Sequence, residues 1–262
     1  MRIALGIEYN GFNFKGWQIQ PQQRTVQGDL EQALSLVANE TITAMQVAGR
    51  TDAGVHATEQ IVHFDTNVSR KERAWVFGAN RFLTHKDISV LWAKPVADDF
   101  HARFSALRRR YRYVIFSRHI RPTILSQYVS WDRRELSLEA MQKACLYLIG
   151  EHDFDAYRTV ACQAHSPIKH VYSLEISQKN NVYYLDIEAN AFLHHMVRNI
   201  AGVLLSIGAG EKEPLWAKQV LDSRDRTQGD VTAPPYGLYL TKVVYDPKFS
   251  LPDTGLNLPV FS

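Results

Sequence analysis

Residues 42–66 read ITAMQVAGRTDAGVHATEQIVHFDT and contain the clearest local pattern of the chain. The two ends of this stretch, 42–48 and 60–66, are rich in β-branched and other apolar residues, so both are predicted to be strands. Between them lies a polar turn at 49–54, whose glycines permit backbone angles that other residues resist. The stretch therefore predicts two strands joined around a turn that carries one carboxylate, Asp52.

The flanking segments extend these two strands into a larger unit. Apolar residues alternate along 3–7, which is typical of a strand with one buried face. Leucine, alanine and valine recur at helical spacing over 30–37, and a second helix and a further strand are predicted at 71–82 and 88–94. The first half of the chain is therefore predicted to run strand, helix, strand, strand, helix, strand.

The second half of the chain repeats this order of elements. Ser137 has the character of an N-cap, and Gly150 follows the end of the helical pattern that begins there. Alternating apolar residues on both sides of a polar turn at 179–181 predict a hairpin. The predicted elements are a strand at 108–116, a helix at 137–149, strands at 172–176 and 183–187, helices at 192–207 and 215–221, and a strand at 238–245.

Two consecutive βαββαβ units predict a mixed α/β (α+β) fold. Each unit would be ferredoxin-like or RRM-like, with an antiparallel sheet and its helices on one face. The predicted boundaries are an N-terminal unit of 1–105, a C-terminal unit of 106–247 and a tail of 248–262. A cleft between the two units would be the natural place for an active site, although the fold by itself specifies no function.

The composition is that of an ordinary globular protein. The 262 residues are 45% hydrophobic and 22% charged, which supplies enough apolar material for a full core. No apolar run approaches the ~20 residues of a membrane span. The chain begins with a strand-like pattern rather than a secretory signal, and its two cysteines, Cys145 and Cys162, make neither a disulfide framework nor a zinc site. We therefore expect a cytoplasmic protein that spans no membrane.

Positive charge is concentrated in one short segment. The net charge is only +3, which by itself is a weak indication of a polyanionic partner. Arginine can pair with phosphates and an aromatic ring can stack on a base, so their mixture favours nucleic acid. The alternative is a solvated strand edge that charge protects from pairing. The segment holds Arg103, Arg108, Arg109, Arg110 and Arg112, with Tyr111 and Tyr113 between them.

Asp52 is the candidate for chemistry in the turn at 49–54. Arg50 precedes it by two residues and Gly54 follows it by two. A nearby guanidinium would keep the carboxylate ionised, and an ionised carboxylate can act as a nucleophile or a base. The other interpretation is an Asx-turn, in which the Asp side chain bonds its own backbone. The residues of the turn alone favour the Asx-turn.

Other motifs give weaker indications. His194 and His195 are adjacent, but neighbours on a helix point about 100° apart and do not readily share one ion, so no metal site is predicted. Arg198 follows on the same predicted helix; it is either a surface charge or, if buried, in need of an acidic partner. The sequence has no Walker loop, no GxGxxG string and no GxSxG element, so it gives no support for nucleotide binding or for a hydrolase serine.

Eight strings of the sequence are most informative when they are taken together. They are GWQ at 16–18, TVQ at 25–27, GRTDAGVHA at 49–57, FHARFSA at 100–106, RYRY at 110–113, GEHDF at 150–154, AFLHHMVRNI at 191–200 and APPYGL at 233–238. With these motifs, in this order and over nearly its whole length, the chain resembles the TruA family of tRNA pseudouridine synthases. The resemblance overrides the Asx-turn interpretation of Asp52.

The resemblance implies an activity and a set of partners. Members of this family isomerise uridine to pseudouridine in the anticodon stem-loop of tRNA, typically at positions 38, 39 and 40. They use no cofactor and act as homodimers, whose joint basic surface holds the tRNA. The resemblance also implies the two-unit fold predicted above, with the active site in the cleft.

The resemblance further implies roles for particular residues. Asp52 would be the catalytic carboxylate, and Arg198 would pair with it across the cleft. Tyr111 would stack on the target base after its extrusion from the stem. Arg50 would fill the space left by the flipped nucleotide or bind its phosphate, and Leu238 would form an apolar wall for the uracil. Whether the carboxylate adds to the sugar, adds to the base or removes the C2′ proton is left open.

The resemblance leaves two more basic residues to assign, and the sequence departs from the family pattern at two places. Arg108 and Arg110 are candidates for binding tRNA phosphates. The segment 83–88 lacks a proline that is usual in the family, and Tyr157 stands where phenylalanine is common. The first departure lies in a loop that could meet tRNA or a dimer partner, so it bears on positional specificity.

The competing hypothesis is a non-catalytic RNA-binding module made of two RRM-like units. Such a module needs aromatic residues on an exposed sheet face, of the RNP1 kind. Tyr111 and Tyr113 share a predicted strand face, but the sequence contains no RNP1 string. A turnover assay separates the two hypotheses, whereas a tRNA-binding assay does not.

Overall fold

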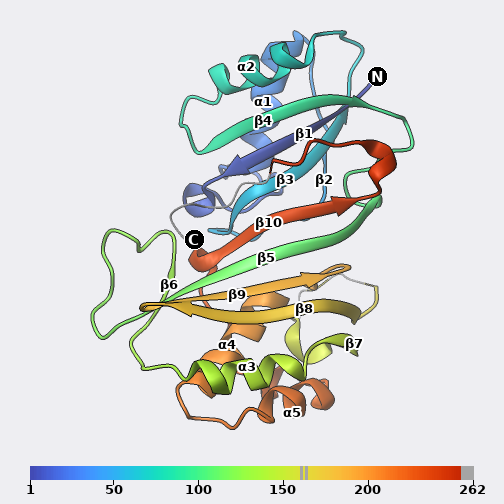
Figure 1. The fold of residues 1–262 in the computed structure, drawn as a ribbon. Helices are drawn as coiled ribbons and strands as arrows, with labels where there is room; N and C mark the ends of the chain where they lie inside the picture. The colour runs from blue at the N-terminus through green and yellow to red at the C-terminus, as the bar shows by residue number, and fades with distance from the viewer. Residues whose placement is uncertain (160–161, 163–164, 255–262) are drawn as a thin grey trace. The chain divides into compact units, whose positions relative to one another are not determined.

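The computed structural model describes residues 1–159, 162 and 165–254. The chain divides into two compact units: the first comprises Met1–Arg109 and Tyr239–Ser262, and the second comprises Arg110–Leu238. Both units combine strands with helices, so the predicted mixed α/β class is confirmed (Figure 1). Among the described residues, none of the helices has the length and apolar character needed to cross a membrane.

The first unit has the predicted βαββαβ order and gains one strand from the far end of the chain. Its elements are β1 (Arg2–Tyr9), α1 (Val26–Ala38), β2 (Gln46–Val47), β3 (His56–Asp65), α2 (Glu72–Phe82), β4 (Ile88–Val96) and β10 (Leu238–Tyr245), with 3-10 helices at Gly11–Asn13 and Pro247–Phe249. Strand β1 lies between β3 and β4 and is antiparallel to both, whereas β10 pairs in parallel with β3. Helices α1 and α2 pack against each other beside this sheet (Figure 1).

Local sequence rules account for the limits of α1. The helix begins after Thr25, whose side chain accepts a hydrogen bond from the Gly28 amide and so satisfies one of the unpaired N–H groups of the first turn. It ends at Asn39, which adopts the left-handed conformation at φ 55°. The position of α1 matters for the site because the segment between β1 and α1 contacts the Asp52 loop.

Strand β2 is much shorter than the strand predicted at 42–48. The side chains of α1 take the main-chain N–H groups that a longer strand would use: Ile42 donates to Ser35 Oγ at 2.9 Å, and Met45 donates to Glu31 Oε1 at 3.0 Å. The chain therefore follows α1 until residue 45 and enters the sheet only for two residues before the Asp52 loop.

The second unit is built around four strands in the order β5-β9-β8-β7, with β6 parallel to β5. Helices α3, α4 and α5 pack together, and α3 also packs against β8. The elements are β5 (Ala106–Ser117, of which the part from Arg110 belongs to this unit), β6 (Ser130–Asp132), α3 (Leu138–Leu146), β7 (Gly150–Asp153), β8 (Ile168–Lys179), β9 (Val182–Ala189), α4 (Met196–Gly208) and α5 (Trp216–Ser223), with 3-10 helices at Asp155–Tyr157, Arg226–Gln228 and Pro235–Gly237.

The structure differs from the prediction in three details of the second half. Strands β6 and β7 were not predicted. The helix predicted from residue 192 begins only at Met196, because His195 has a left-handed backbone at φ 64°. The last strand, assigned from sequence to a unit of 106–247, pairs with β3 through Tyr239 and Leu240 and belongs to the first unit. Pairing between residues so far apart in sequence leaves no trace in a local pattern.

His63 on β3 makes the stability of the first unit depend on pH. Its Nδ1 accepts a 3.0 Å hydrogen bond from the Ala102 amide, and burial, reinforced by the charge of Arg2, lowers the pKa of His63 to about 4. The unfolded chain takes up this proton near pH 6.5 and the folded protein does so only near pH 4, so stability rises with pH across this window. We expect the free energy of unfolding to fall by up to about 3 kcal/mol between pH 6.5 and 4 because of this group.

The measurement is urea unfolding across this pH range. His63→Gln should remove the slope that His63 contributes, and the exposed His119→Gln should leave the slope as in the wild type. Parallel pH profiles for wild type and His63→Gln would contradict the assignment.

Candidate functional site

The loop that carries Asp52 connects β2 to β3 in the first unit. A main-chain hydrogen bond of 3.2 Å from the Val55 amide to the Asp52 carbonyl closes its turn. Gly54 lies within the turn at φ 80°, a backbone angle that favours glycine over residues with a side chain. Asp52 is half-buried and the neighbouring Ala53 is exposed. The carboxylate therefore belongs to the accessible tip of a closed turn.

The segment that follows β1 braces this loop through its backbone. The Trp17 amide donates to the Thr51 carbonyl at 3.0 Å. The approach is so close that a Cβ on Gly11 would lie 1.8 Å from the Val55 carbonyl oxygen, and a Cβ on Gly16 would lie 2.9 Å from the Thr51 carbonyl oxygen. Both glycines are therefore required by contact with the Asp52 loop, which explains part of the sequence string at 16–18.

A buried polar network supports the loop from inside the unit. The hydroxyl groups of Tyr9 and Thr51 share a hydrogen bond of 2.8 Å, and Gln60 Nε2 donates to the Gly49 carbonyl at 2.7 Å and to the Tyr9 oxygen at 3.4 Å. Burial raises the pKa of Tyr9 to about 12, so its hydroxyl stays protonated and available for this bond. The loop is thus fixed on both sides of Arg50, whose side chain is exposed.

Arg109 holds the start of the same loop. Its guanidinium is buried, and Nη2 donates both to the Ala48 carbonyl at 2.9 Å and to the Arg103 carbonyl at 2.7 Å. Ala48 immediately precedes Gly49, the first residue of the turn. The sequence leaves open whether the basic segment that contains Arg109 binds nucleic acid or protects a strand edge. The structure shows that Arg109 itself supports the Asp52 loop.

The other arginines of the basic segment also differ from one another. Arg110 pairs with Glu188 at 2.6 Å and Arg112 pairs with Asp186 at 2.8 Å, so both bind carboxylates of β9 within the second unit. Arg108 is exposed. The prediction that Arg110 binds phosphate stays a prediction. A phosphate would have to bind a guanidinium that is already paired with Glu188.

Tyr111 lies on β5 and is buried rather than displayed. Its ring meets that of Phe192 edge-on, with centroids 4.9 Å apart and an interplanar angle of 80°. Tyr113, two residues further, shares this face as predicted; it is fully buried and donates its hydroxyl to the Pro234 carbonyl at 2.8 Å. An RRM-like binding module needs aromatic rings on an exposed sheet face. The complete burial of Tyr113 therefore argues against the competing hypothesis.

Arg198 and Leu238 belong to the second unit with Tyr111, whereas Asp52 belongs to the first. Arg198 is the one residue of the largely apolar helix α4 that is not buried, and its Nε donates to the Ala233 carbonyl at 2.8 Å. Leu238 is buried. The pairing of Asp52 with Arg198, and the cleft in which the two would meet, stay predictions.

The two adjacent histidines do not lie on a helix. Both precede α4, and their rings are close, with centroids 4.1 Å apart. The His194 amide contacts Cys162 Sγ at 3.4 Å, and its carbonyl accepts from the Thr159 amide at 3.1 Å. The argument that helical geometry would spread the two rings apart was therefore wrong, while the expectation of no metal stays an expectation.

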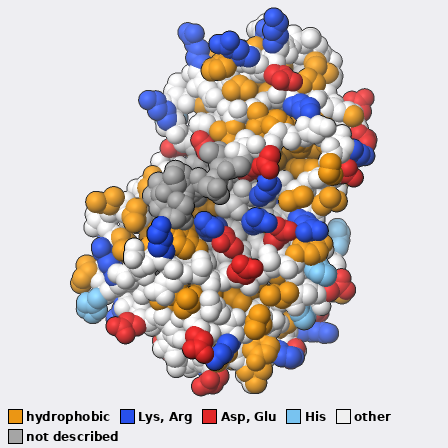
Figure 2. Space-filling view, in the orientation of Figure 1, with side chains coloured by type: hydrophobic (Ala, Val, Ile, Leu, Met, Phe, Trp, Pro, Cys, Tyr) orange, Lys and Arg blue, Asp and Glu red, His pale blue; other side chains and the backbone are white. Residues whose placement is uncertain are grey.

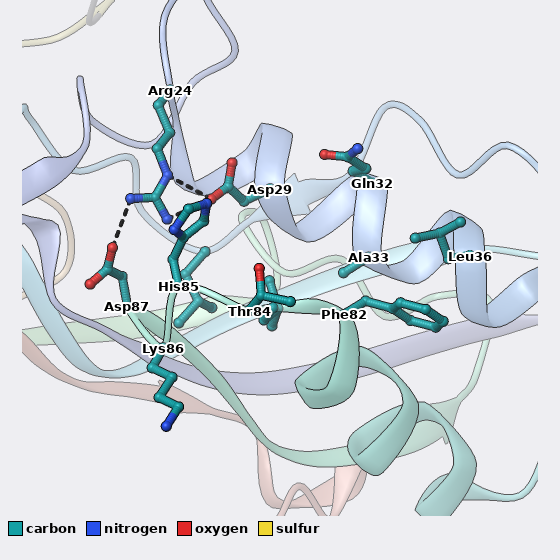
Figure 3. A pocket seen from close by; sticks show the side chains of 12 residues that line it. Arg24, Asp29, Gln32, Ala33, Leu36, Phe82, Thr84, His85, Lys86 and Asp87 are labelled. Carbon is teal, nitrogen blue, oxygen red and sulfur yellow. Dashed lines mark hydrogen bonds and ion pairs between the residues drawn. The ribbon is translucent and has the colours of Figure 1, made fainter.

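A groove in the first unit is lined by the segment at 83–88 and by α1 (Figure 3). Arg24 bridges Asp29 at 2.9 Å and Asp87 at 2.7 Å within it, so these three charges already satisfy one another. Asp52 does not line this groove. The groove is therefore a poor site for chemistry on a uridine. The segment at 83–88, which lacks the proline that is usual in the family, lines this groove and not the Asp52 loop.

Helix α2 presents a basic surface that is typical of a solvated helix face and is not part of the candidate site. Figure 2 shows Lys and Arg side chains around this helix at the top of the view, with hydrophobic side chains among them. The exposed basic residues on or beside α2 are Arg70, Lys71, Arg73 and Arg81.

The βαββαβ unit, the braced Asp52 loop and the strand with Tyr111 are features that we expect of a pseudouridine synthase. Comparison with known families agrees: residues 7–105 and 144–246 match the family described as tRNA pseudouridine synthase. The chain belongs to this family.

Curated relatives match over almost their entire length. Proteins named tRNA pseudouridine synthase A are 56% identical over 260 residues in Nitrosococcus oceani, covering 99% of each chain, and 55% identical over 257 residues in Alcanivorax borkumensis, covering 98% of this chain and 96% of the relative. The protein of that name in Coxiella burnetii (strain Dugway 5J108-111) is 53% identical over 256 residues, covering 98% of this chain and 97% of the relative.

Proposed function

We propose that this protein isomerises uridine to pseudouridine in tRNA, at positions 38, 39 and 40 of the anticodon stem-loop. The observation that carries the proposal is the Asp52 loop, whose backbone is fixed from two sides while Asp52 itself stays half-buried at the tip. Membership of the family, over nearly the whole chain, supports the same activity.

The chemistry matches what one fixed carboxylate can do. The reaction breaks the N1–C1′ bond, turns the uracil and joins C5 to C1′; N1 gains a proton and C5 loses one, so product and substrate are isomers. Asp52 would add to the sugar, add to the base, or remove the C2′ proton to open a glycal route. A rigid loop favours each of these routes because the carboxylate is in place before the substrate binds.

Residues of the second unit would hold the base. Tyr111 would stack on the extruded uracil while its ring packs in a T-shaped contact with Phe192. Leu238 would supply an apolar wall, and Arg198 would form an ion pair with the Asp52 carboxylate. These roles require the two units to meet around the uridine.

The remaining basic residues would bind the RNA backbone. Arg50, exposed on the Asp52 loop, would fill the space of the flipped nucleotide or bind its phosphate, and Arg108 and Arg110 would contact phosphates nearby. We further infer a homodimer that acts in the cytoplasm without a cofactor.

The test of the proposed function is pseudouridine mapping on an unmodified tRNA transcript treated with the wild-type protein alone. Isomerisation confined to positions 38, 39 and 40 is the expected result. Tight binding of tRNA without isomerisation would favour the RNA-binding module instead.

Two variants of Tyr111 distinguish the contribution of its ring to activity from that of its hydroxyl group. Stacking of an aromatic ring on a base contributes about 1–3 kcal/mol, so Tyr111→Ala should lower kcat/KM by roughly 5- to 150-fold. Tyr111→Phe keeps the ring and should lie within about threefold of the wild type. The measurement is single-turnover pseudouridine formation, with thermal unfolding as a control because the ring is buried. Equal losses for both variants would implicate the hydroxyl and contradict stacking.

A further inference from the structure

The turn at 101–105 in the first unit exposes an aromatic ring. Phe100 and Phe104 are four residues apart, yet Phe100 is fully buried against Tyr245 and Phe249 while the Phe104 side chain is 77% exposed. A large exposed apolar side chain is ordinary on a loosely held loop. This turn is not loosely held.

Hydrogen bonds within the turn fix its backbone. The amides of Arg103 and Phe104 both donate to His101 Nδ1, at 3.1 and 3.2 Å. The His101 amide donates to Ser105 Oγ at 3.0 Å, and the Ser105 amide returns a bond of 2.9 Å to the His101 carbonyl. His101 therefore acts as an acceptor at the centre of the turn, and its pKa is lowered, chiefly by burial, which favours the neutral ring that these bonds need.

Three other elements brace the turn from outside. His63 on β3 accepts the Ala102 amide at 3.0 Å, and Tyr245 at the end of β10 donates its hydroxyl to the Ala102 carbonyl at 2.6 Å. Arg109 on β5 donates to the Arg103 carbonyl with the same Nη2 atom that binds the Ala48 carbonyl at the start of the Asp52 loop. One buried guanidinium thus connects the exposed turn directly to the candidate catalytic loop.

The surroundings of Phe104 suit a nucleotide. The His101 ring lies beside it, with centroids 4.4 Å apart, and the Arg103 guanidinium carbon is 5.6 Å from its centroid. A base can stack on an aromatic face, and an adjacent arginine can donate hydrogen bonds to the phosphate or add a cation–π contact. Because hydrogen bonds already fix the backbone of the turn, binding costs little backbone freedom.

We propose that Phe104 and Arg103 form a contact for an unpaired base and its phosphate in the bound tRNA, apart from the uridine that reacts. The inference rests on the proposed function because that function makes tRNA the substrate. The contact contributes affinity and positions the RNA on the first unit; it takes no part in bond making.

The experiment measures the Kd of unmodified tRNA for three variants, with thermal unfolding as a check. Phe104→Ala should weaken binding by roughly 5- to 150-fold, and Phe104→Trp should bind within about threefold of the wild type, because stacking tolerates any aromatic ring. The matched control is Phe77→Ala: Phe77 on α2 is also highly exposed and also lies beside an arginine, with Arg73 5.0 Å from its centroid. The control should bind as the wild type does.

Turnover separates this contact from catalysis. At saturating tRNA, Phe104→Ala should keep kcat within about threefold while KM rises in step with Kd. Wild-type affinity in Phe104→Ala, equal weakening by Ala and Trp, or an equal loss in Phe77→Ala would each overturn the proposal. If the wild-type protein binds tRNA but forms no pseudouridine, the proposed function is wrong and the contact is not contradicted. If the wild-type protein forms pseudouridine but Phe104→Ala binds tRNA with unchanged affinity, only the proposed contact is wrong.

Discussion

Asp52→Asn is expected to abolish pseudouridine formation while tRNA binding is retained. The substitution removes the charge and one carboxylate oxygen with almost no change in volume, and the loop is held by main-chain and neighbouring groups rather than by this side chain alone. Loss of a catalytic carboxylate costs at least about a thousandfold in kcat. Affinity for tRNA should stay within about threefold, because the proposed RNA contacts lie on other residues.

The measurement is single-turnover isomerisation on a tRNA transcript, with affinity determined separately by titration. Asp98→Asn is the matched control: it makes the same chemical change at an exposed aspartate of the first unit and should leave kcat unchanged. Asp52→Ala guards against slow conversion of Asn back to Asp. Activity within about tenfold of the wild type in both Asp52 variants would remove Asp52 from its proposed role.

The sequence predicts the first unit well because its signals are local. Alternation along β1 and helical spacing in α1 depend on residues within a few positions of one another. The prediction weakens where a distant partner decides the outcome. The strand predicted from residue 42 is shortened because Ser35 and Glu31 of α1 take its amides, and neither contact is visible in the strand's own residues.

The candidate site shows the same division. The string at 49–57 by itself favours an Asx-turn, and only the resemblance over the whole chain makes Asp52 the catalytic candidate. The basic segment is harder to interpret, because successive strand residues face opposite ways. Arg109 is buried while Arg108 and Arg110 are exposed, a distinction that depends on which face of β5 is covered.

Supporting residues leave the weakest trace in sequence. Tyr9 and Gln60 look like ordinary strand residues, and they are recognisable as supports of the Asp52 loop only from the bonds they make to Thr51 and Gly49. Gln60 follows the polar residues Thr58 and Glu59 in the sequence, and only its complete burial in the structure sets it apart. Buried polar groups are normally hydrogen-bonded, so such a position predicts a partner without naming it.

Gly11→Ala is expected to lower kcat strongly although it adds only one methyl group. Nothing in the backbone angle of Gly11 demands glycine, but a Cβ there would lie 1.8 Å from the Val55 carbonyl oxygen, so the main chain of the Asp52 loop has to move. Overpacking of this kind costs about 1–3 kcal/mol of stability. A displacement of about 1 Å at a catalytic group can cost roughly a hundredfold in rate, so we expect kcat to fall by about that factor.

Gly210→Ala is the control that strains the backbone without bringing the added Cβ into contact with a neighbouring atom. Gly210 has a left-handed backbone at φ 74°, yet no atom lies within 4 Å of its added Cβ, so the change strains the chain by about 1–2 kcal/mol without touching a neighbour. Its kcat should match the wild type although its melting temperature falls. Gly16→Ala, where the added Cβ would lie 2.9 Å from the Thr51 carbonyl oxygen, provides a second collision with the same loop if Gly11→Ala does not fold. If the collision variants lose stability but keep kcat, as Gly210→Ala should, then the rigidity of the Asp52 loop is not what catalysis requires.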